Sequence, residues 1–254
     1  MALEAIESVM QQQYFQVEII LVDDGSSDNT IDEVASQFPA THIVTRHDAG
    51  PGQARNAGVA ASEGDILMFL DSDDIWLDNH VQQLVDVLKR GFQVAYGVAH
   101  TKNMIGGADF LIPENGTGIE GDCFDALLNW CFLVPSAMAI QRDTFMTIGG
   151  FDTLSFGEDW IFFLKLAAQF PFGFAGPEPI TLRRLHPGSL CFLSDKKKLL
   201  AIISQVLTFL KNEPSATVTH CNHFKMLHDW TADNKTQWPT VQEWYLSMLQ
   251  EKII

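Results

Sequence analysis

The sequence predicts an α/β fold in which helices flank a mostly parallel sheet and a helical tail follows. Three observations support this prediction. From about residue 3 to residue 90, segments with helical spacing alternate with short apolar runs. These runs are continuous rather than alternating, which is typical of parallel strands that helices cover on both faces. From about Asp195 onward the spacing is helical only, with breaks near Pro214 and Pro239.

Each element of the first half has its own signal. Apolar spacing predicts helices over 3–13, 30–38 and 79–90, and the runs VEIILV, HIVT and DILMFL predict strands over 17–22, 42–45 and 65–70. Between the last two strands, GPGQARNAGVAAS predicts a loop that opens into a helix of small residues. Ligands of such sheets bind at the carboxyl ends of the strands, where two acidic turns of this sequence fall.

The second half is less regular. The patterns predict extended segments within 92–111, a strand over 136–140, extended pieces at FGFAG and ITLRRLH, and helices over 122–130, 142–148 and 158–169. The chain shows neither internal repeats nor a low-complexity linker. We therefore predict one catalytic domain over 1–190 and a helical C-terminal extension over 191–254.

Composition limits the function. With 46% hydrophobic and 19% charged residues, the 254-residue chain is typical of a folded protein. A formal net charge of −16 argues against a nucleic-acid partner, because little basic surface is available to bind phosphates. An anionic substrate must therefore be bound by a metal ion and a few cationic side chains.

Cysteine spacing and hydropathy indicate the compartment. The four cysteines form no C-x-x-C pair, so the sequence suggests neither a zinc site nor a disulfide framework. The first residues lack the basic and apolar regions of a signal peptide, and no run reaches membrane-spanning length. We expect a cytoplasmic protein, with peripheral contact with the inner face of the membrane left open.

The stretch GDILMFLDSDDIWLD runs five apolar residues into Asp71, Asp73 and Asp74. If the extended backbone continues that far, the side chains of Asp71 and Asp73 emerge on one side. Such a pair is tolerable where a divalent cation lies between it and a polyanionic ligand, and Mg²⁺ or Mn²⁺ prefers oxygen ligands. The alternative is a solvated acidic turn in which Asp74 or Asp78 caps the next helix.

Two further groups lie near the predicted binding edge. The carboxylates of Asp23 and Asp24 follow a strand and could accept hydrogen bonds from a base or ribose, although such a turn also caps helices. Arg55 lies in the first turns of the small-residue helix, where it could face an anion while glycines let the backbone approach. The alternative for Arg55 is an ordinary surface position on the helix.

Glu158 and Asp159 open the apolar helix predicted over 158–169. Acidic residues in a first turn are favourable to the helix dipole, which gives a structural reason for the pair. The functional hypothesis is that Asp159 is a general base, which takes a proton from an acceptor hydroxyl. His186 in RRLHPGS is a candidate metal ligand or phosphate contact, with a structural role as the alternative.

Four blocks together resemble a known family. VEIILVDDGSSDNT, GPGQARNAGVAASEGDILMFLDSDDIWLDNHV, IGGFDTLSFGEDWIFFLKLA and LRRLHPGSL follow one another over about Ala5 to Leu190. Their order and spacing resemble those of the GT-A-fold glycosyltransferases of family 2. The resemblance implies inverting transfer of a sugar from a nucleotide diphosphate sugar, with a bias to UDP, to an acceptor hydroxyl.

The resemblance also implies roles for single residues. Asp71-Ser72-Asp73 is similar to the DxD motif, which places Asp73 and Asp71 at a Mg²⁺ or Mn²⁺ ion. Glu158-Asp159 is similar to the ED motif, with Asp159 as the base. Asp23 and Asp24 match nucleotide-contacting positions, and Arg55 matches the arginine of the G-x-A-R-N segment.

One departure from the family pattern concerns the sheet. Members ordinarily begin with an apolar strand ahead of the helix that here starts near Leu3, and this chain lacks that strand. It would lie centrally in the sheet and supply backbone contacts to the nucleotide. The missing strand could reflect a misplaced start of the sequence or a true loss, and in the case of a true loss we expect an interior sheet position without a partner.

The expected partners are a nucleotide-sugar donor and a glycan or lipid-linked acceptor, in polysaccharide or glycoconjugate assembly, with the oligomeric state left open. The alternative is a noncatalytic nucleotide-sugar-binding or scaffold protein descended from such enzymes. The missing strand favours this alternative, whereas the intact DxD-like and ED-like blocks disfavour it.

Overall fold

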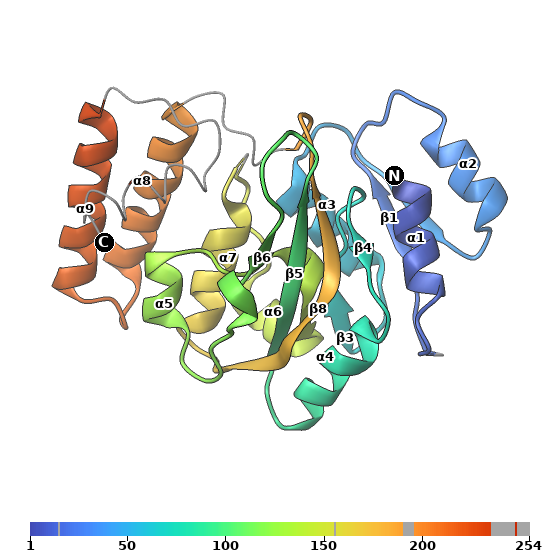
Figure 1. Cartoon of the computed structure of the whole chain (residues 1–254), viewed down its shortest axis with the longest axis horizontal. Coiled ribbons are helices and arrows are strands. Elements are labelled where there is room, and N and C mark those ends of the chain that lie inside the picture. Colours follow the sequence, from blue (N-terminus) through green and yellow to red (C-terminus); the bar gives the residue numbers. More distant parts are fainter. Residues whose placement is uncertain (15, 155, 190–195, 235–246, 248–254) are drawn as a thin grey trace.

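The strands of the protein form two sheets with helices around them (Figure 1). This is seen in a computed structural model, which describes residues 1–254 except 15, 155, 190–195, 235–246 and 248–254. The strands are β1 (Ile20–Asp23), β2 (His42–Thr45), β3 (Ile66–Met68), β4 (Ile75–Trp76), β5 (Val94–Asn103), β6 (Phe110–Ile112), β7 (Met138–Gln141) and β8 (Phe172–Leu185).

The α-helices alternate with these strands and then continue beyond them. They are α1 (Ala2–Met10), α2 (Thr30–Gln37), α3 (Pro51–Ala61), α4 (His80–Lys89), α5 (Phe124–Asn129), α6 (Arg142–Ile148), α7 (Glu158–Ala167), α8 (Lys196–Asn212) and α9 (Val218–Asp233). Short 3₁₀ turns occupy Glu114–Gly116 and Pro135–Ala137. No helix in the described part of the chain is both long enough and apolar enough to span a membrane.

The larger sheet has mixed strand directions. Its order is β3-β7-β5-β8-β4, with β6 on β5, while β1 and β2 form a separate parallel pair. The β5–β8 pair is also parallel, whereas β3–β7, β4–β8, β5–β6 and β5–β7 are antiparallel. The predicted α/β class, with flanking helices and a helical tail, is confirmed, and the mostly parallel pairing is corrected to a mixed one.

Burial explains why the sequence did not reveal these directions. Three successive residues of β7, Met138, Ala139 and Ile140, are fully buried although β7 is antiparallel to both of its neighbours. A strand buried on both faces reads as a continuous apolar run whichever way it points, so the pattern indicates burial and not direction.

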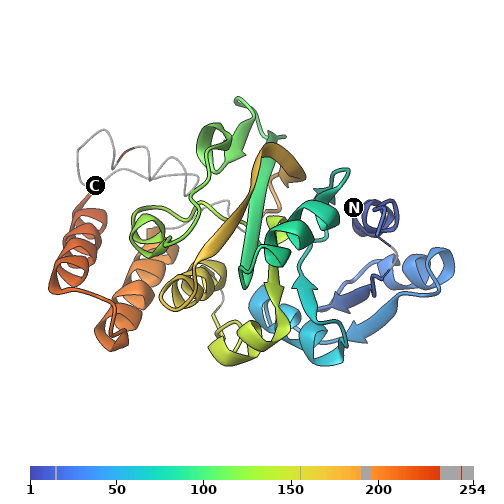
Figure 2. The same ribbon diagram turned by 90° about the horizontal axis from the view of Figure 1, so that it is seen from below.

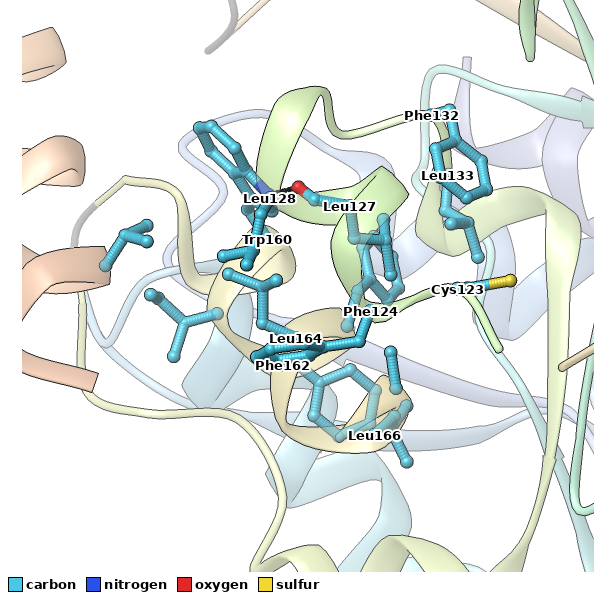
Figure 3. Close-up of a cluster of buried hydrophobic side chains, with 14 of the residues drawn as sticks. Cys123, Phe124, Leu127, Leu128, Phe132, Leu133, Trp160, Phe162, Leu164 and Leu166 are labelled. Carbon is cyan, nitrogen blue, oxygen red and sulfur yellow. Dashed lines mark hydrogen bonds between the residues drawn. The ribbon is translucent and has the colours of Figure 1, made fainter. Parts of the chain in front are cut away.

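The main hydrophobic core lies between the larger sheet and helices α5, α6, α7 and α8. Figure 3 shows its centre, where α7 places Trp160, Phe162 and Leu164 against Phe124 and Leu127 of α5. The indole Nε1 of Trp160 donates a hydrogen bond to the carbonyl oxygen of Leu127 at 2.7 Å. This bond satisfies the one polar group that the buried ring carries.

The helical tail packs onto that same core. Leu199, Ile203 and Val206 of α8 are buried within the main cluster, and α9 adds Phe224 and Leu227. In both views α8 and α9 lie at one end of the molecule, with α1, α2, β1 and β2 at the other (Figures 1 and 2). The break near Pro214 is confirmed, because α8 ends at Asn212 and α9 begins at Val218.

Two predictions about the tail concern residues outside the described part. The boundary between residues 190 and 191 falls within 190–195, and the break near Pro239 falls within 235–246. The division into two domains stays a prediction.

We predict that Ile203→Ala lowers the free energy of unfolding of the whole chain by about 2–5 kcal/mol, because it opens a cavity in a core that the tail and the sheet share. Urea unfolding followed by near-UV circular dichroism measures this change. Val218→Ala, at a position of α9 that is 77% exposed, is the matched control. A lowered transition for the tail alone, with the main transition unchanged, would contradict the shared core.

Candidate active site

Arg55 of α3 lies at the centre of the candidate site. Its Nη2 donates to Oδ1 of Asp71 at 2.7 Å, and its Nη1 donates to Oε1 of Glu158 at 2.9 Å. The guanidinium also lies 5.3 Å from the centre of the Phe151 ring. Its side chain is only 11% exposed. One arginine therefore joins the two acidic segments that the sequence singled out.

Local backbone contacts explain how Arg55 reaches both carboxylates. A Cβ atom on Gly52, one turn earlier, would lie 2.9 Å from Cγ of Glu158, so glycine permits the close approach of α3 and α7. Asn56 then fixes the turn ahead of α7. Its Nδ2 donates to the carbonyl of Phe151 at 2.8 Å, and its Oδ1 accepts from the Phe151 amide at 3.0 Å.

The electrostatics of this group follow from burial and charge. Burial disfavours the guanidinium charge, but the attraction of Asp71 and Glu158 outweighs it and raises the pKa of Arg55. Burial, followed by the neighbouring Asp159 charge, raises the pKa of Glu158 to about 7. Loss of water around the carboxyl raises the pKa of Asp159 too, although Arg55 opposes this effect.

The acidic segment after β3 is a turn and not a continued strand. β3 ends at Met68, and the amide of Asp74 donates to the carbonyl of Asp71 at 2.9 Å. The expectation that Asp71 and Asp73 point to one side is therefore corrected. The Asp71 carboxylate contacts Arg55, whereas Oδ2 of Asp73 lies 3.2 Å from Nε2 of His186.

A buried network that the sequence did not reveal holds this turn. Oγ of Ser136 donates to Oδ2 of Asp74 at 2.6 Å and accepts from the Asp71 amide at 3.1 Å. The amide of Arg184 donates to Oδ1 of Asp74 at 3.1 Å, and its Nε donates to the Asp73 carbonyl. Burial, together with the charge of Asp71, raises the pKa of Asp74 to about 7.

Asp23 and Asp24 end β1, and their carboxylates meet nearby backbone groups. Oδ1 of Asp23 accepts from the Ser26 amide at 2.9 Å. Oδ1 and Oδ2 of Asp24 accept from the amides of Ala49 and Gly50 at 2.9 and 2.7 Å. Asp24 thereby fixes the loop that begins α3. Among the contacts described, neither residue meets Arg55, and their nucleotide-binding role stays a prediction.

A divalent cation needs oxygen or nitrogen ligands that lie close together. The described residues include no cluster of three or more His, Cys, Asp or Glu that could enclose a metal ion. Asp73 and His186 nevertheless form an adjacent, partly exposed oxygen and nitrogen pair. Two protein ligands fit the way in which Mg²⁺ or Mn²⁺ binds when water and substrate phosphates complete its coordination.

The structure thus brings together Arg55, Asp71, Glu158 and Asp159, and it places Asp73 of the acidic turn beside His186, which follows β8. Sequence reasoning treated Asp74 only as a helix cap and did not consider Ser136. The continuation of DSD into a third acid was the available signal for Asp74.

A family model described as "Glycosyl transferase family 2" matches residues 1–148. A protein of Nostoc sp., named an uncharacterized glycosyltransferase, is 35% identical over 150 residues, which are 55% of this chain and 46% of that protein. The Escherichia coli protein WfgD, named a UDP-Glc:alpha-D-GlcNAc-diphosphoundecaprenol beta-1,3-glucosyltransferase, is 32% identical over 120 residues, 44% of this chain and 46% of WfgD. The chain thus matches less than half of either relative's length.

A solved structure is similar over nearly the whole chain. The crystal structure of Staphylococcus aureus TarS 1-349 in complex with UDP-GlcNAc aligns with a TM-score of 0.70 at 15% identity, covering 99% of this chain and 78% of the other. This likeness confirms the predicted fold class.

We predict that Ser136→Ala lowers the free energy of unfolding by about 1–3 kcal/mol, because it leaves the Asp74 carboxyl and the Asp71 amide without this partner in a buried position. Chemical denaturation measures the effect. Thr208→Ala removes an exposed hydroxyl on α8 and should change stability by less than about 0.5 kcal/mol. Equal effects of the two variants would show that Ser136 does not hold the turn.

Proposed function

Because the chain belongs to glycosyl transferase family 2, we propose that it transfers a sugar, with inversion, from a nucleotide diphosphate sugar to an acceptor hydroxyl. The observation that carries this proposal is the position of Arg55, which joins the Asp71 turn to the Glu158 and Asp159 helix start. One site then contains both a region for the diphosphate and a carboxylate for the acceptor. The similarity to TarS, which was solved in complex with UDP-GlcNAc, favours UDP as the nucleotide.

In the proposed reaction, the Asp159 carboxylate takes the proton of the acceptor hydroxyl. The hydroxyl oxygen forms a bond with the anomeric carbon as the bond from that carbon to the diphosphate oxygen breaks. The bonding electrons leave with the nucleoside diphosphate. Because its pKa is raised, the Asp159 carboxylate is a stronger base than the carboxylate of an exposed aspartate. At pH values above that raised pKa it is ionised and can accept the proton.

The departing diphosphate requires positive charge, which a chain of net charge −16 supplies at few places. Arg55 is one source, and its planar guanidinium can bind two oxygens of a phosphate. Asp73 and His186 would hold a Mg²⁺ or Mn²⁺ ion. When bound, that ion would neutralise the charge that develops on the diphosphate.

The acceptor is proposed from the relatives. WfgD is named for transfer to a sugar on diphosphoundecaprenol, which is a lipid carrier. We propose a glycan or lipid-linked hydroxyl as acceptor here, in polysaccharide or glycoconjugate assembly. Peripheral contact with a membrane would bring this chain to such an acceptor.

A noncatalytic nucleotide-sugar-binding protein is the second candidate. The separation of the β1–β2 pair from the larger sheet favours it, because the part of the site at the end of β1 is not joined to β3 by strand pairing in the described chain. Calorimetry with UDP and Mn²⁺ tests binding, and hydrolysis of UDP-sugars tests catalysis. Binding without hydrolysis or transfer would favour this candidate.

We predict that Asp159→Asn lowers the rate of sugar transfer by about 10²- to 10⁴-fold, since the amide cannot accept the acceptor proton. A coupled assay for released UDP measures the rate, and circular dichroism checks the fold. Asp229→Asn, on the exposed surface of α9, is the control. Full activity of Asp159→Asn would contradict its role as base.

Asp73→Ala should remove most metal-dependent transfer and weaken binding of UDP in the presence of Mn²⁺, because one of two metal-holding groups is lost. Titration calorimetry with UDP, with and without Mn²⁺, gives a readout apart from activity. The same Mn²⁺ enhancement in wild type and variant would remove Asp73 from the metal site.

The acidic limb of the pH–rate profile should lie above the ordinary aspartate range, because activity requires ionised Asp159 and its pKa is raised. The positive charge of Arg55 opposes this rise, so Arg55→Met should raise the pKa of Asp159 further and move the limb to higher pH. Lys89→Met, at an exposed ion pair, is the control. A limb that stays in place in Arg55→Met would contradict the effect of Arg55 on Asp159.

A further inference from the structure

A cavity of ≈ 360 Å³ lies between α7 and α8. Both views show these two helices beside each other (Figures 1 and 2), and Asp152 and Leu154, ahead of α7, complete the lining. The size falls within the range of about 300–1,000 Å³ that is usual for small-molecule pockets. None of the lining residues belongs to the group around Arg55, so the cavity is a separate feature of the molecule.

One face of α8 forms a wall of the cavity. Its members are three and four residues apart, which puts them on one side of the helix, and they are Gln205, Thr208, Phe209 and Asn212. The buried core positions of α8 have the same spacing on a different side and include Leu199, Ile203, Val206 and Leu210. This helix therefore presents a second face to the cavity, and that face is polar apart from Phe209.

The opposite wall comes from α7, through Ile161 and Lys165, which are about one turn apart. Nζ of Lys165 donates to Oδ1 of Asp152 at 2.6 Å, which joins α7 to the loop ahead of it. Asp159 is two residues before Ile161, and residues two apart in an α-helix point about 200° away from each other. The cavity thus lies on the other side of α7 from the proposed base.

Gln205 carries a polar atom that lacks a partner. Its Oε1 is buried and accepts no hydrogen bond within the described part of the chain. Such an acceptor costs free energy, because it has lost its water and gained no hydrogen bond in exchange. The last torsion of a glutamine side chain is broad, so a rotation about it turns the amide toward the cavity that Gln205 lines. There the amide can bind a ligand that offers a hydrogen-bond donor.

The charges around the cavity do not suit an anion. Lys165 is the one cationic side chain among the lining residues that the structure describes, and its ammonium already contacts Asp152. Glu213 adds a second carboxylate to the lining. An anionic ligand would therefore be repelled, whereas hydroxyl groups can donate to the carboxylates and accept from the remaining hydrogens of the ammonium.

Apolar surface lies among these polar groups. Leu154, Ile161 and Phe209 line the cavity, and the Phe209 ring meets the ring of Phe124 edge-on, with the ring centres 6.4 Å apart. This contact restrains the orientation of the Phe209 ring. A pyranose ring has C–H groups on its faces and hydroxyl groups around its rim. It can therefore pack a face on the apolar surface while its hydroxyl groups meet the polar side chains.

We propose that the cavity between α7 and α8 is a second binding site, which takes one uncharged saccharide unit apart from the reaction centre. The saccharide packs a ring face against Phe209. Its hydroxyl groups bind the Gln205 amide, the Asp152 carboxylate and the Lys165 ammonium. The proposal goes beyond the sugar transfer described above, and it rests on the cavity and not on that reaction.

The test is a titration of the whole chain followed by NMR. The probes are N-acetylglucosamine and methyl β-glucoside, which are uncharged, and glucuronate is the anionic comparison. Backbone amide shifts of α7 and α8 and the side-chain amide of Gln205 report on the cavity. We expect saturable shifts there with a Kd of roughly 1–10 mM for at least one uncharged probe, as is usual for a ligand of one sugar ring, and none with glucuronate.

Gln205→Leu is the variant that separates binding from folding. It removes the amide and should weaken binding of the uncharged probe by about tenfold or more. Its Tm should be unchanged or raised, because a buried acceptor without a partner is removed. Gln37→Leu, at an exposed position of α2, is the matched control and should bind as the wild type does. A purely structural role of Gln205 predicts the reverse, a lowered Tm with unaltered binding.

Three outcomes would overturn the proposal. The first is the absence of saturable shifts at α7 and α8 for both uncharged probes, including shifts confined to the surroundings of Arg55. The second is equal binding of glucuronate, which would contradict the selection by charge. The third is a set of nuclear Overhauser effects in the free protein that show another part of the chain filling the cavity against Gln205. Because no outcome is measured as activity, a failure here is distinct from a failure of the proposed reaction.

Discussion

The paired contact of Arg55 with Asp71 and Glu158 is the interaction on which the site depends. It connects α3, the turn after β3 and the start of α7, three segments that no other single side chain in the site joins among the contacts described. A buried arginine between two carboxylates is stable only while both carboxylates are present, because loss of either one leaves a charge that water solvates poorly. The site is thus assembled together with the core around Phe151, and its geometry depends on the packing of α3 against α7.

Local signals made much of the fold predictable. The strand at His42–Thr45 and the helix at Arg142–Ile148 have the predicted bounds, because turn residues and apolar spacing mark both ends. Long-range pairing was less accessible. FGFAG and ITLRRLH were expected as separate pieces, yet they form the single strand β8, whose irregular register against β5 accommodates the residues between them. That the two pieces form one strand follows from their pairing with β5, which the local sequence pattern does not reveal.

The site shows the same division between local and distant information. Sequence reasoning selected Arg55, Asp71, Glu158 and Asp159, which the fold brings together, because their residue types and positions near element ends are local properties. The support of the acidic turn was missed, since Ser136 is 62 positions from Asp74 and Arg184 is 110 positions from it. The side chains of Asp71 and Asp73 were expected on one side, because side chains two apart in a strand share a face. The backbone turns at these residues instead, so the two side chains point in different directions.

The main core has a consequence for synthesis on the ribosome. It gathers side chains from Val59 through Leu227, so it cannot be completed until α9 has been synthesised. Until α8 and α9 are available, the apolar surface of α5 and α7 that they cover stays open to water and to other nascent chains. Contacts so distant along the chain also slow folding, because the entropy of closing long loops opposes them. Productive folding of this core therefore waits for α8 and α9, which close the interior.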